Sequence, residues 1–310
     1  MDTIASLMRR VDQKRLAGSI DYLARDPLPC RRLNYTLPGH AKSTLDEADD
    51  FIQAQLESWG YVIEKEAVQV QAFRRDLAKP LAHQYSRPDP SDPWYAAHNL
   101  YAKKIGTTQP GEVIVVVAHK DSQSWMDCGP GAHDNAVGTA GVLEIARVLR
   151  EYAPKRSIWF LFCNEEHTPW TSVTAARNLA ESERNVIAVL NLDSIGGKSE
   201  EDRRAGRMVN VTRYTTPEGE ELADLMAALN ERHAIGLAQA KYRCDQPGDD
   251  DGSFIKAGIP AAVLNVGSFP YAEPHYHREE DTPETVDVTN VSLATQLSLA
   301  AVLHLDAHGT

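Results

Sequence analysis

Apolar and polar residues alternate in blocks along the second half of the chain. GEVIVVVAH, at residues 111–119, is a continuous run rich in β-branched residues, as expected for a strand buried on both faces. Similar runs predict further strands at 157–163, 186–193 and 259–266. Apolar residues at helical spacing predict helices at 136–152, 172–183, 219–233 and 288–308. Strands that alternate with helices predict an α/β fold, with a mostly parallel central sheet and helices on both faces.

The first hundred residues show a less regular pattern. Residues 1–18 predict an amphipathic helix, and residues 42–59 predict a second helix that Ser43 is placed to cap. A strand pattern follows at 61–73. Residues 74–98 hold four prolines among charged residues and therefore predict a long surface excursion, either a lid or a surface for a partner.

Composition is that of an ordinary globular protein. Of the 310 residues, 42% are hydrophobic and 25% are charged, so we expect one domain spanning residues 1–310. The net charge of −12 argues against nucleic acid as a partner, because binding to phosphates needs a basic surface.

The sequence shows neither a pattern typical of a membrane-spanning segment nor one typical of a secretory leader. No apolar run reaches the roughly 18 residues that span a bilayer, and the N-terminus lacks the apolar core of a secretory leader. We therefore expect a cytoplasmic protein without a membrane partner, although a chain whose leader had been removed would read the same way. The widely spaced cysteines predict reduced thiols rather than disulfides or a thiolate zinc site; they are Cys30, Cys128, Cys163 and Cys244.

Side chains able to bind metals follow the ends of the predicted strands. His119 ends the first strand, Glu165 and Glu166 follow the second, and Asp193 ends the third. The fourth strand leads through a short loop to His277 in the segment PHYHREED. Ligands of open α/β sheets bind beyond the carboxyl ends of the strands, so we expect these side chains to meet at one edge.

Two aspartates in the connecting segments add to this set. Asp121 lies two residues after His119, where a carboxylate can hold the second imidazole nitrogen and fix its tautomer. Asp134 lies in the glycine-rich segment 129–141, at the entrance of a predicted helix. It is placed either to cap that helix or to bridge two cations with its two oxygens.

Two imidazoles and three carboxylates suit a pair of zinc ions that hold a water between them and lower its pKa. The sequence offers such a set, namely His119, Asp134, Glu166, Asp193 and His277. Glu165 is then adjacent to a ligand without being one. This is the expected place for a general base that takes a proton from the attacking water.

Five segments together resemble the co-catalytic dizinc aminopeptidase family, which includes the bacterial leucyl aminopeptidases and the catalytic domain of glutamate carboxypeptidase. They are AHKDS (118–122), GAHDNAVG (131–138), NEEH (164–167), NLDSIG (191–196) and YHREEDTPETVD (276–287). The resemblance implies a zinc exopeptidase-like fold. It also implies a metallopeptidase that hydrolyses N-terminal residues from peptides through a hydroxide bridging two Zn²⁺ ions per chain.

The resemblance also implies a role for each matching residue. His119 and Asp193 would bind one zinc ion, Glu166 and His277 the other, and Asp134 would bridge them. Glu165 would be the general base and Asp121 the partner of His119. Asp281, in the same motif as His277, would order its loop.

The sequence departs from the family pattern at two places. HTPWTS follows the double glutamate, where the family often has Gly-Leu, and Trp170 is therefore expected to line the substrate pocket. An acidic run stands where the family often has Asp-His, so Asp250 and Asp251 are candidate contacts for a substrate ammonium group. A merely acidic loop is the alternative for that run.

Three other functions stay open at this point. A glutaminyl cyclase of the same superfamily is a single-zinc acyltransferase that shares the His-x-Asp pair, the double glutamate and the late histidine. A carboxypeptidase or dipeptidase would need cationic groups to hold the substrate carboxylate, and the sequence does not place them. A peptidase-like scaffold without activity would usually lack some ligands, whereas all five are present in this chain.

Overall fold

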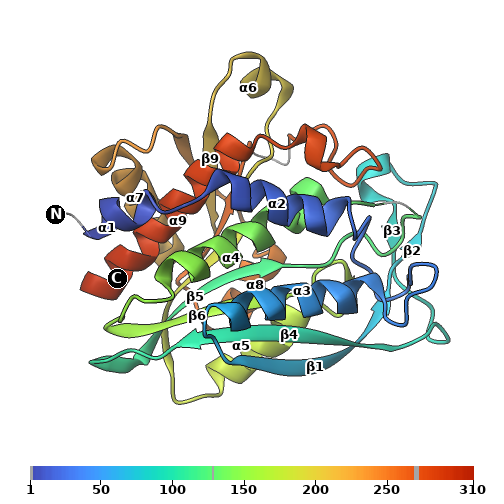
Figure 1. Ribbon diagram of the computed structural model, residues 1–310, viewed down its shortest axis with the longest axis horizontal. Helices are drawn as coiled ribbons and strands as arrows, with labels where there is room; N and C mark the ends of the chain where they lie inside the picture. Colours follow the sequence, from blue (N-terminus) through green and yellow to red (C-terminus); the bar gives the residue numbers. More distant parts are fainter. Residues whose placement is uncertain (1–2, 128, 269–271) are drawn as a thin grey trace.

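The computed structural model describes residues 3–127, 129–268 and 272–310, so Cys128 lies outside the described residues. A twisted sheet crosses the molecule between layers of helices (Figure 1). Its strands are β1 (Ile63–Ala72), β4 (Tyr95–Lys104), β5 (Gln109–His119), β6 (Arg156–Cys163), β7 (His167–Thr168), β8 (Asn185–Leu192), β9 (Val209–Tyr214), β10 (Ala238–Arg243) and β11 (Ala262–Val266). Within the described residues their order across the sheet is β10-β9-β11-β8-β5-β6-β4-β1-β7.

The middle of the sheet is parallel. Strand β5 pairs in parallel with both β6 and β8, and β8 pairs in parallel with β11. Antiparallel pairings lie toward both sides, where β4 joins β6, β1 joins β4, and β9 joins β11. The predicted α/β class is confirmed, and the parallel strands bring their carboxyl ends to one edge.

Strand β5 shows why the sheet is covered on both faces. Ile114 and Val116 belong to one core cluster, whereas Val115 and Val117, which point the other way, belong to a second. All four side chains have no exposed surface, which explains the unbroken β-branched run in the sequence.

Helices fill both sides of the sheet (Figure 1). The larger core cluster contains residues of α1 (Thr3–Met8), α2 (Gln13–Ala24), α3 (Thr44–Ser58), α4 (Val137–Leu149), α7 (Pro217–Arg232) and α9 (Val288–His308). The second cluster contains residues of α5 (Thr171–Ala180) and α8 (Asp249–Lys256). Helix α6 (Glu200–Arg204) projects away from the body of the molecule.

The first half of the chain differs from the prediction in two ways. The single amphipathic helix predicted at 1–18 is two helices, α1 and α2, because Asp12 caps the second one by accepting from the backbone of Lys14 and Arg15. The predicted excursion at 74–98 ends earlier, because β4 begins at Tyr95 and pairs with both β1 and β6.

Two short hydrogen-bonded segments give the remaining excursion some order. Strands β2 (Arg74–Arg75) and β3 (Tyr85–Ser86) form a small hairpin around the 3₁₀ helix η1 (Leu81–His83).

Two further short elements precede long helices. A second 3₁₀ helix, η3 (Pro283–Thr285), precedes α9, and one irregular helical turn, η2 (Ala132–Ala136), precedes α4.

Helix α9 satisfies the length and composition of a membrane-spanning segment, which the sequence pattern had not predicted. In the structure, 72% of its apolar stretch is buried inside the protein. Its apolar residues contribute to the larger core cluster, and a buried core helix meets the same criteria as a membrane span.

Gly138, at the start of α4, gives a test of how tightly this helix packs on the sheet. A Cβ atom at this position would overlap the carbonyl oxygen of Leu192 at the end of β8. Because neither backbone can yield easily, we expect Gly138→Ala to lower the free energy of unfolding by about 1–3 kcal/mol or more in chemical denaturation.

Gly18, on the exposed side of α2, is the matched control. No atom lies within 4 Å of the position that an added Cβ would take, so Gly18→Ala is expected to stabilise the protein by roughly 0.5–1 kcal/mol. If Gly138→Ala were as stable as the unaltered chain, the close approach of α4 and β8 would be wrong.

Candidate metal centre

The five predicted ligands meet at the carboxyl edge of the parallel strands. His119 ends β5, Glu166 lies just after β6, and Asp193 directly follows β8. Asp134 lies on the turn before α4, and His277 lies on the segment between β11 and α9. Each of the five is at most 6% exposed.

Asp134 lies between the two histidines and faces each with a different oxygen. Its Oδ1 atom is 3.1 Å from Nε2 of His119, and its Oδ2 atom is 2.8 Å from Nε2 of His277. A carboxylate in this arrangement can serve one cation on each side.

The other two carboxylates divide between the histidines. Asp193 Oδ1 is 3.7 Å from Nε2 of His119, and Glu166 Oε1 is 3.2 Å from Nε2 of His277. Ligand atoms of His119, Asp134 and Glu166 all lie within 4.8 Å of one another. Imidazole nitrogens and carboxylate oxygens at this spacing fit zinc.

Buried negative charge dominates the electrostatics of the centre. Burial lowers the pKa of His119, but its hydrogen bonds to aspartates outweigh burial and raise it well above its usual value. The pKa of His277 rises in the same direction, because the charges of Glu166 and Asp134 outweigh its burial. Burial, and then the charge of Asp134, raise the pKa of Glu166 to about 7. The site therefore favours added positive charge, which a divalent cation supplies as protons do.

Asp121 connects the ends of β5 and β6. Its Oδ1 atom lies 3.2 Å from Nδ1 of His119 and accepts from the backbone N–H of Glu165 at 2.9 Å. Its Oδ2 atom accepts from the backbone N–H of Glu166 at 2.8 Å and lies 2.8 Å from Nδ1 of His167. One carboxylate therefore orients a predicted ligand and fixes the backbone that carries the two glutamates.

His167 was not assigned a role from the sequence, where HTPW looked like a departure that affects substrate choice. Its ring is fully buried between Asp121 and the backbone N–H of Leu33, which donates to Nε2 at 3.3 Å. Its position directly after the double glutamate was the available signal. The residue acts on Asp121 and not on the pocket.

Asp281 orders the turn that carries Asp134 rather than the loop of His277. Its carboxylate accepts from the backbone N–H groups of His133 at 2.7 Å and of Asp134 at 3.1 Å. These contacts fix the backbone of Asp134.

Arg31 is a second support that the sequence did not reveal. Its guanidinium has no exposed surface and donates to four carbonyl oxygens at 2.6–2.7 Å, those of Lys120, Leu23, Pro130 and Gly131. It thereby joins the segment after His119 to the turn before Asp134. An isolated arginine in a loop carries no pattern that would have predicted this.

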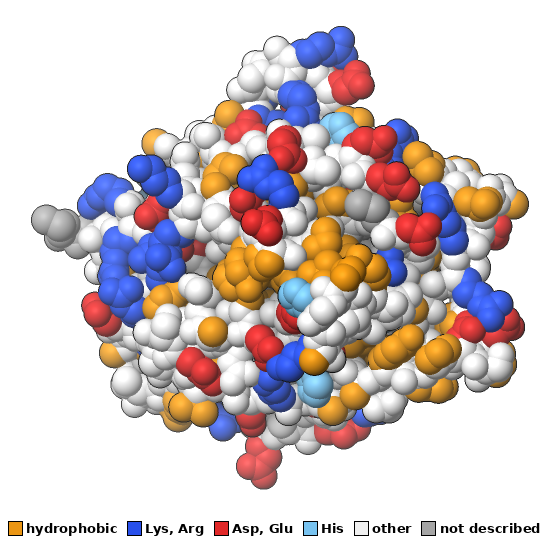
Figure 2. Space-filling view, turned by 45° about the vertical axis from the view of Figure 1, so that its right-hand side comes forward, with side chains coloured by type: hydrophobic (Ala, Val, Ile, Leu, Met, Phe, Trp, Pro, Cys, Tyr) orange, Lys and Arg blue, Asp and Glu red, His pale blue; other side chains and the backbone are white. Residues whose placement is uncertain are grey.

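A pocket of about 190 Å³ opens beside Glu165 and Glu166. Its wall is largely aromatic, with Phe73, Tyr85, Trp125, Trp170 and Tyr276. Figure 2 shows this side of the molecule, where hydrophobic side chains gather near the centre of the face. Trp170 lies in the wall of this pocket, next to the candidate centre, and its contact with a substrate stays a prediction.

Glu165 is part of the pocket lining. Its Oε2 atom is buried and has no hydrogen-bond partner among the described residues. Burial, and then the negative charges of Asp250 and Asp249, raise the pKa of Glu165 well above its usual value. A raised pKa suits a group that accepts a proton during a reaction.

Asp250 and Asp251 do not lie where the sequence suggested, because both are fully buried and neither lines the pocket. Oδ2 of Asp250 accepts from the thiol of Cys163 at 3.0 Å, and Asp251 forms an ion pair with Arg213 at 3.1 Å. The run begins helix α8, which turns these two side chains inward and leaves Asp249 at the pocket.

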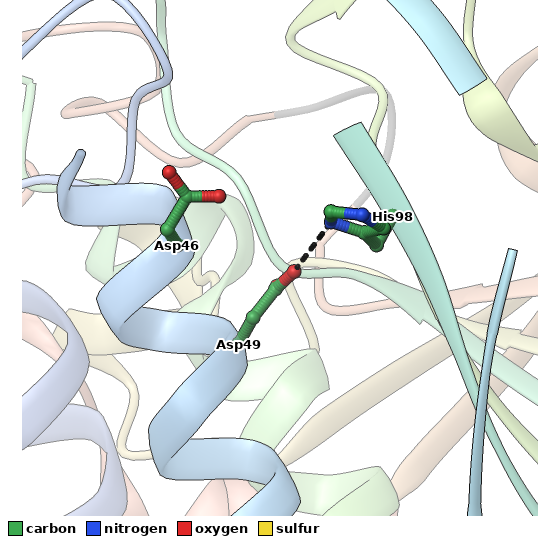
Figure 3. Close-up of side chains that lie close together, drawn as sticks. All are labelled: Asp46, Asp49 and His98. Carbon is green, nitrogen blue, oxygen red and sulfur yellow. Dashed lines mark ion pairs between the residues drawn. The ribbon is translucent and has the colours of Figure 1, made fainter. Parts of the chain in front are cut away.

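A second group of potential ligands lies apart from this centre, with Asp46 and Asp49 on α3 and His98 on β4 (Figure 3). Asp49 Oδ2 is 3.6 Å from Nδ1 of His98, but its Oδ1 atom pairs with the buried ammonium group of Lys120 at 2.6 Å. Because Lys120 already supplies a cation, this group is part of the protein's internal ion pairing.

Comparison with known proteins agrees with this geometry. The profile of Peptidase family M28 matches residues 99–302. A probable zinc metalloprotease from Pyrenophora teres f. teres is 30% identical over 247 residues, which cover 65% of this chain and 51% of that protein. The chain thus spans about half the length of this relative and of a second probable zinc metalloprotease, from Pyrenophora tritici-repentis.

Solved structures share the fold. An aminopeptidase from Aneurinibacillus sp. strain AM-1 superimposes with a TM-score of 0.75 at 18% identity, covering 98% of this chain and 96% of the other. A glutaminyl cyclase from Bacteroides thetaiotaomicron gives 0.71 at 15% identity, covering 94% and 98%. At these identities the similarity establishes the fold alone.

The role of Arg31 can be separated from a general effect on stability. Arg31→Met would leave buried carbonyls without donors, which is expected to destabilise the protein by about 3 kcal/mol or more. Because the segments after His119 and before Asp134 would also separate, we expect a clearly weaker affinity for zinc in a competition titration with a chromogenic chelator.

Arg156 provides the matched control at the opposite end of β6. It is buried, pairs with Glu112 at 2.5 Å and donates to the carbonyl of Asp306 at 2.6 Å. Arg156→Met is expected to lower stability while leaving zinc affinity unchanged. Equal zinc affinity in both variants would contradict the role given to Arg31.

Proposed function

This chain belongs to Peptidase family M28, and from that premise we propose that it is a zinc-dependent aminopeptidase that removes N-terminal residues from peptides. The observation that carries the proposal is the position of Asp134, whose two oxygens face His119 and His277 separately. Zinc suits the donor set, and this arrangement supports two ions per chain.

Each ion would have its own pair of ligands in addition to Asp134. His119 and Asp193 would hold one zinc ion, and Glu166 and His277 would hold the other. When bound, the ions would lower the pKa of a water between them and polarise the substrate carbonyl. Asp121 would keep Nε2 of His119 directed at the metal by holding its other nitrogen.

Glu165 would act as the general base. It is adjacent to a ligand, faces the pocket and retains a carboxylate oxygen without a partner among the described residues. It would take the proton of the attacking water and deliver it to the departing amine, so that the peptide bond breaks without an unstable amide anion.

The charge of the pocket favours the amino end of a peptide. Three acidic residues line it, Glu165, Glu166 and Asp249, and none of its described lining residues is a lysine or arginine. The carboxylates would attract a free ammonium group, whereas no lysine or arginine among these lining residues would hold a terminal carboxylate. This supports an aminopeptidase over a carboxypeptidase.

The shared fold of glutaminyl cyclases makes a single-zinc acyltransferase the main alternative. In this chain the two histidines face opposite oxygens of one carboxylate, an arrangement that supports two metal ions rather than one. We therefore favour peptide hydrolysis.

A substrate panel tests the proposed reaction. We expect release of the N-terminal residue from leucyl and alanyl anilides and loss of activity when their amino groups are acetylated. Removing metal with a chelator should abolish turnover, and added Zn²⁺ should restore it. Conversion of N-terminal glutamine to pyroglutamate, or release of C-terminal residues, would contradict the proposal.

Replacing the base tests the mechanism. Glu165→Gln is expected to lower kcat by roughly 10²–10⁴-fold, because the amide cannot accept the proton, while zinc content stays the same. Glu183→Gln, on an exposed glutamate after α5, is the control with normal turnover. Near-normal kcat in Glu165→Gln would exclude this residue as the base.

A further inference from the structure

The excursion between β1 and β4 reaches the candidate metal centre. Its hairpin, residues 74–86, consists of β2, the 3₁₀ helix η1 and β3. The two strands pair Arg74 with Ser86 and Arg75 with Tyr85. Prolines and charges in the sequence suggested a surface segment, but two hydrogen-bonded connections join it to predicted ligands.

The first connection runs from the tip of the hairpin to His277. The carbonyl oxygen of Ala82, in η1, lies 2.8 Å from Nδ1 of this histidine. An Nδ1–H that donates to this carbonyl leaves Nε2, which faces Asp134 and Glu166, as the nitrogen that would bind a metal ion. His119 uses a carboxylate, Asp121, for the same purpose.

The second connection runs from Phe73, the residue directly before the hairpin, to Glu166. The backbone N–H of Phe73 donates to the hydroxyl of Ser124 at 3.0 Å, and that hydroxyl donates to the carbonyl oxygen of Glu166 at 2.6 Å. Ser124 is 2% exposed, so this bridge is protected from solvent.

Both connections concern the same proposed metal position. His277 and Glu166 would share one zinc ion, whereas His119 and Asp193 would hold the other. The described residues include no hydrogen bond between the hairpin and His119 or Asp193. The hairpin therefore supports the two halves of the centre unequally.

Aromatic contacts extend this support into the pocket. The ring of Tyr85, on β3, lies 5.3 Å from that of Trp125 and 6.2 Å from that of His277, edge-on to the histidine. Trp125 is also edge-on to His277, at 5.1 Å. Tyr85 and Phe73 are both part of the pocket wall.

We infer that the 74–86 hairpin holds the metal position of Glu166 and His277 through its backbone, and that its Tyr85 side chain selects bulky apolar N-terminal residues. The inference rests on the proposed aminopeptidase function. It makes the carbonyl of Ala82 a positioning group for one metal ion and Tyr85 a determinant of specificity.

The pairing of the hairpin permits a deletion that separates these roles. Replacing residues 76–84 by Asn-Gly joins Arg75 to Tyr85 through a two-residue turn, which keeps their pairing. This variant removes the carbonyl of Ala82 but retains Phe73 and Tyr85. Tyr85→Ala does the reverse, because it leaves the backbone of η1 in place.

Zinc affinity is the readout for the backbone role. In the shortened variant we expect one of the two zinc-binding steps to weaken by about 10–100-fold, as for the loss of a group that orients a metal ligand, and the other to stay unchanged. The weakened step should be the one that His277→Ala eliminates and His119→Ala keeps. Ser124→Ala, which breaks the second connection without shortening the chain, should weaken the same step.

Steady-state kinetics are the readout for the side chain. Tyr85→Ala should bind two zinc ions as the unaltered chain does, and should raise KM about tenfold for phenylalanyl or leucyl substrates but not for alanyl ones. Leu77→Ser changes a hairpin side chain that is 73% exposed, and is the control expected to alter neither readout.

The outcomes separate this inference from the proposed function. If the unaltered chain hydrolyses aminoacyl anilides with two zinc ions and both the shortened and Ser124→Ala variants bind them equally well, the positioning role is wrong. An unchanged preference in Tyr85→Ala would refute the specificity role. If the unaltered chain binds a single zinc ion, the two-metal proposal and this inference are both overturned.

Discussion

Carboxylates with at most 6% exposure lie together at the carboxyl edge of the central sheet, and their mutual repulsion is the constraint on which the rest of the structure depends. They include Asp121, Asp134, Glu166, Asp193, Asp281 and Asp250. Buried charge is tolerated only when it is paired or hydrogen-bonded. Two of the carboxylates have such partners in the backbone: Asp121 accepts from the strand end that bears the glutamates, and Asp281 from the turn that bears Asp134. Asp134 and Glu166 face imidazoles, and Asp193 accepts from the hydroxyl of Ser194 at 3.1 Å and lies 3.7 Å from His119. Bound cations would complete this compensation.

The surrounding fold supplies rigid support for this cluster. The parallel strands β5, β6 and β8 are covered on both faces, so their ends have little freedom to spread apart under repulsion. Arg31 and Lys120 place two buried cations close by, and both bind groups on segments adjacent to the ligands. His119 and His277 are oriented by different means, a carboxylate for one and a hairpin carbonyl for the other. The two histidines therefore have separate supports, whereas Asp121 also holds the backbone of Glu166.

Much of the site could be predicted because sequence position determines it directly. His119 ends a strand, and Glu166 and Asp193 follow the ends of two others; the parallel pairing of these strands requires a shared edge. The supports of these residues could not be predicted, since they depend on contacts between segments that are remote in sequence: Arg31 reaches residues about 90 to 100 positions away. The sequence wrongly placed Asp250 and Asp251 at the pocket, for a related reason. Only the start of α8 at Asp249 decides which side chain of the acidic run reaches the pocket, and an acidic run alone does not specify a helix.

Crystallographic anomalous scattering at the zinc edge tests the central claim most directly, because it locates metal ions independently of activity. Two peaks are predicted on opposite sides of the Asp134 carboxylate, roughly 3.5–4 Å apart. One should lie beside His119 and Asp193 and the other beside Glu166 and His277. A single peak at this edge of the sheet, or strong scattering only beside Asp49 and His98, would contradict the account.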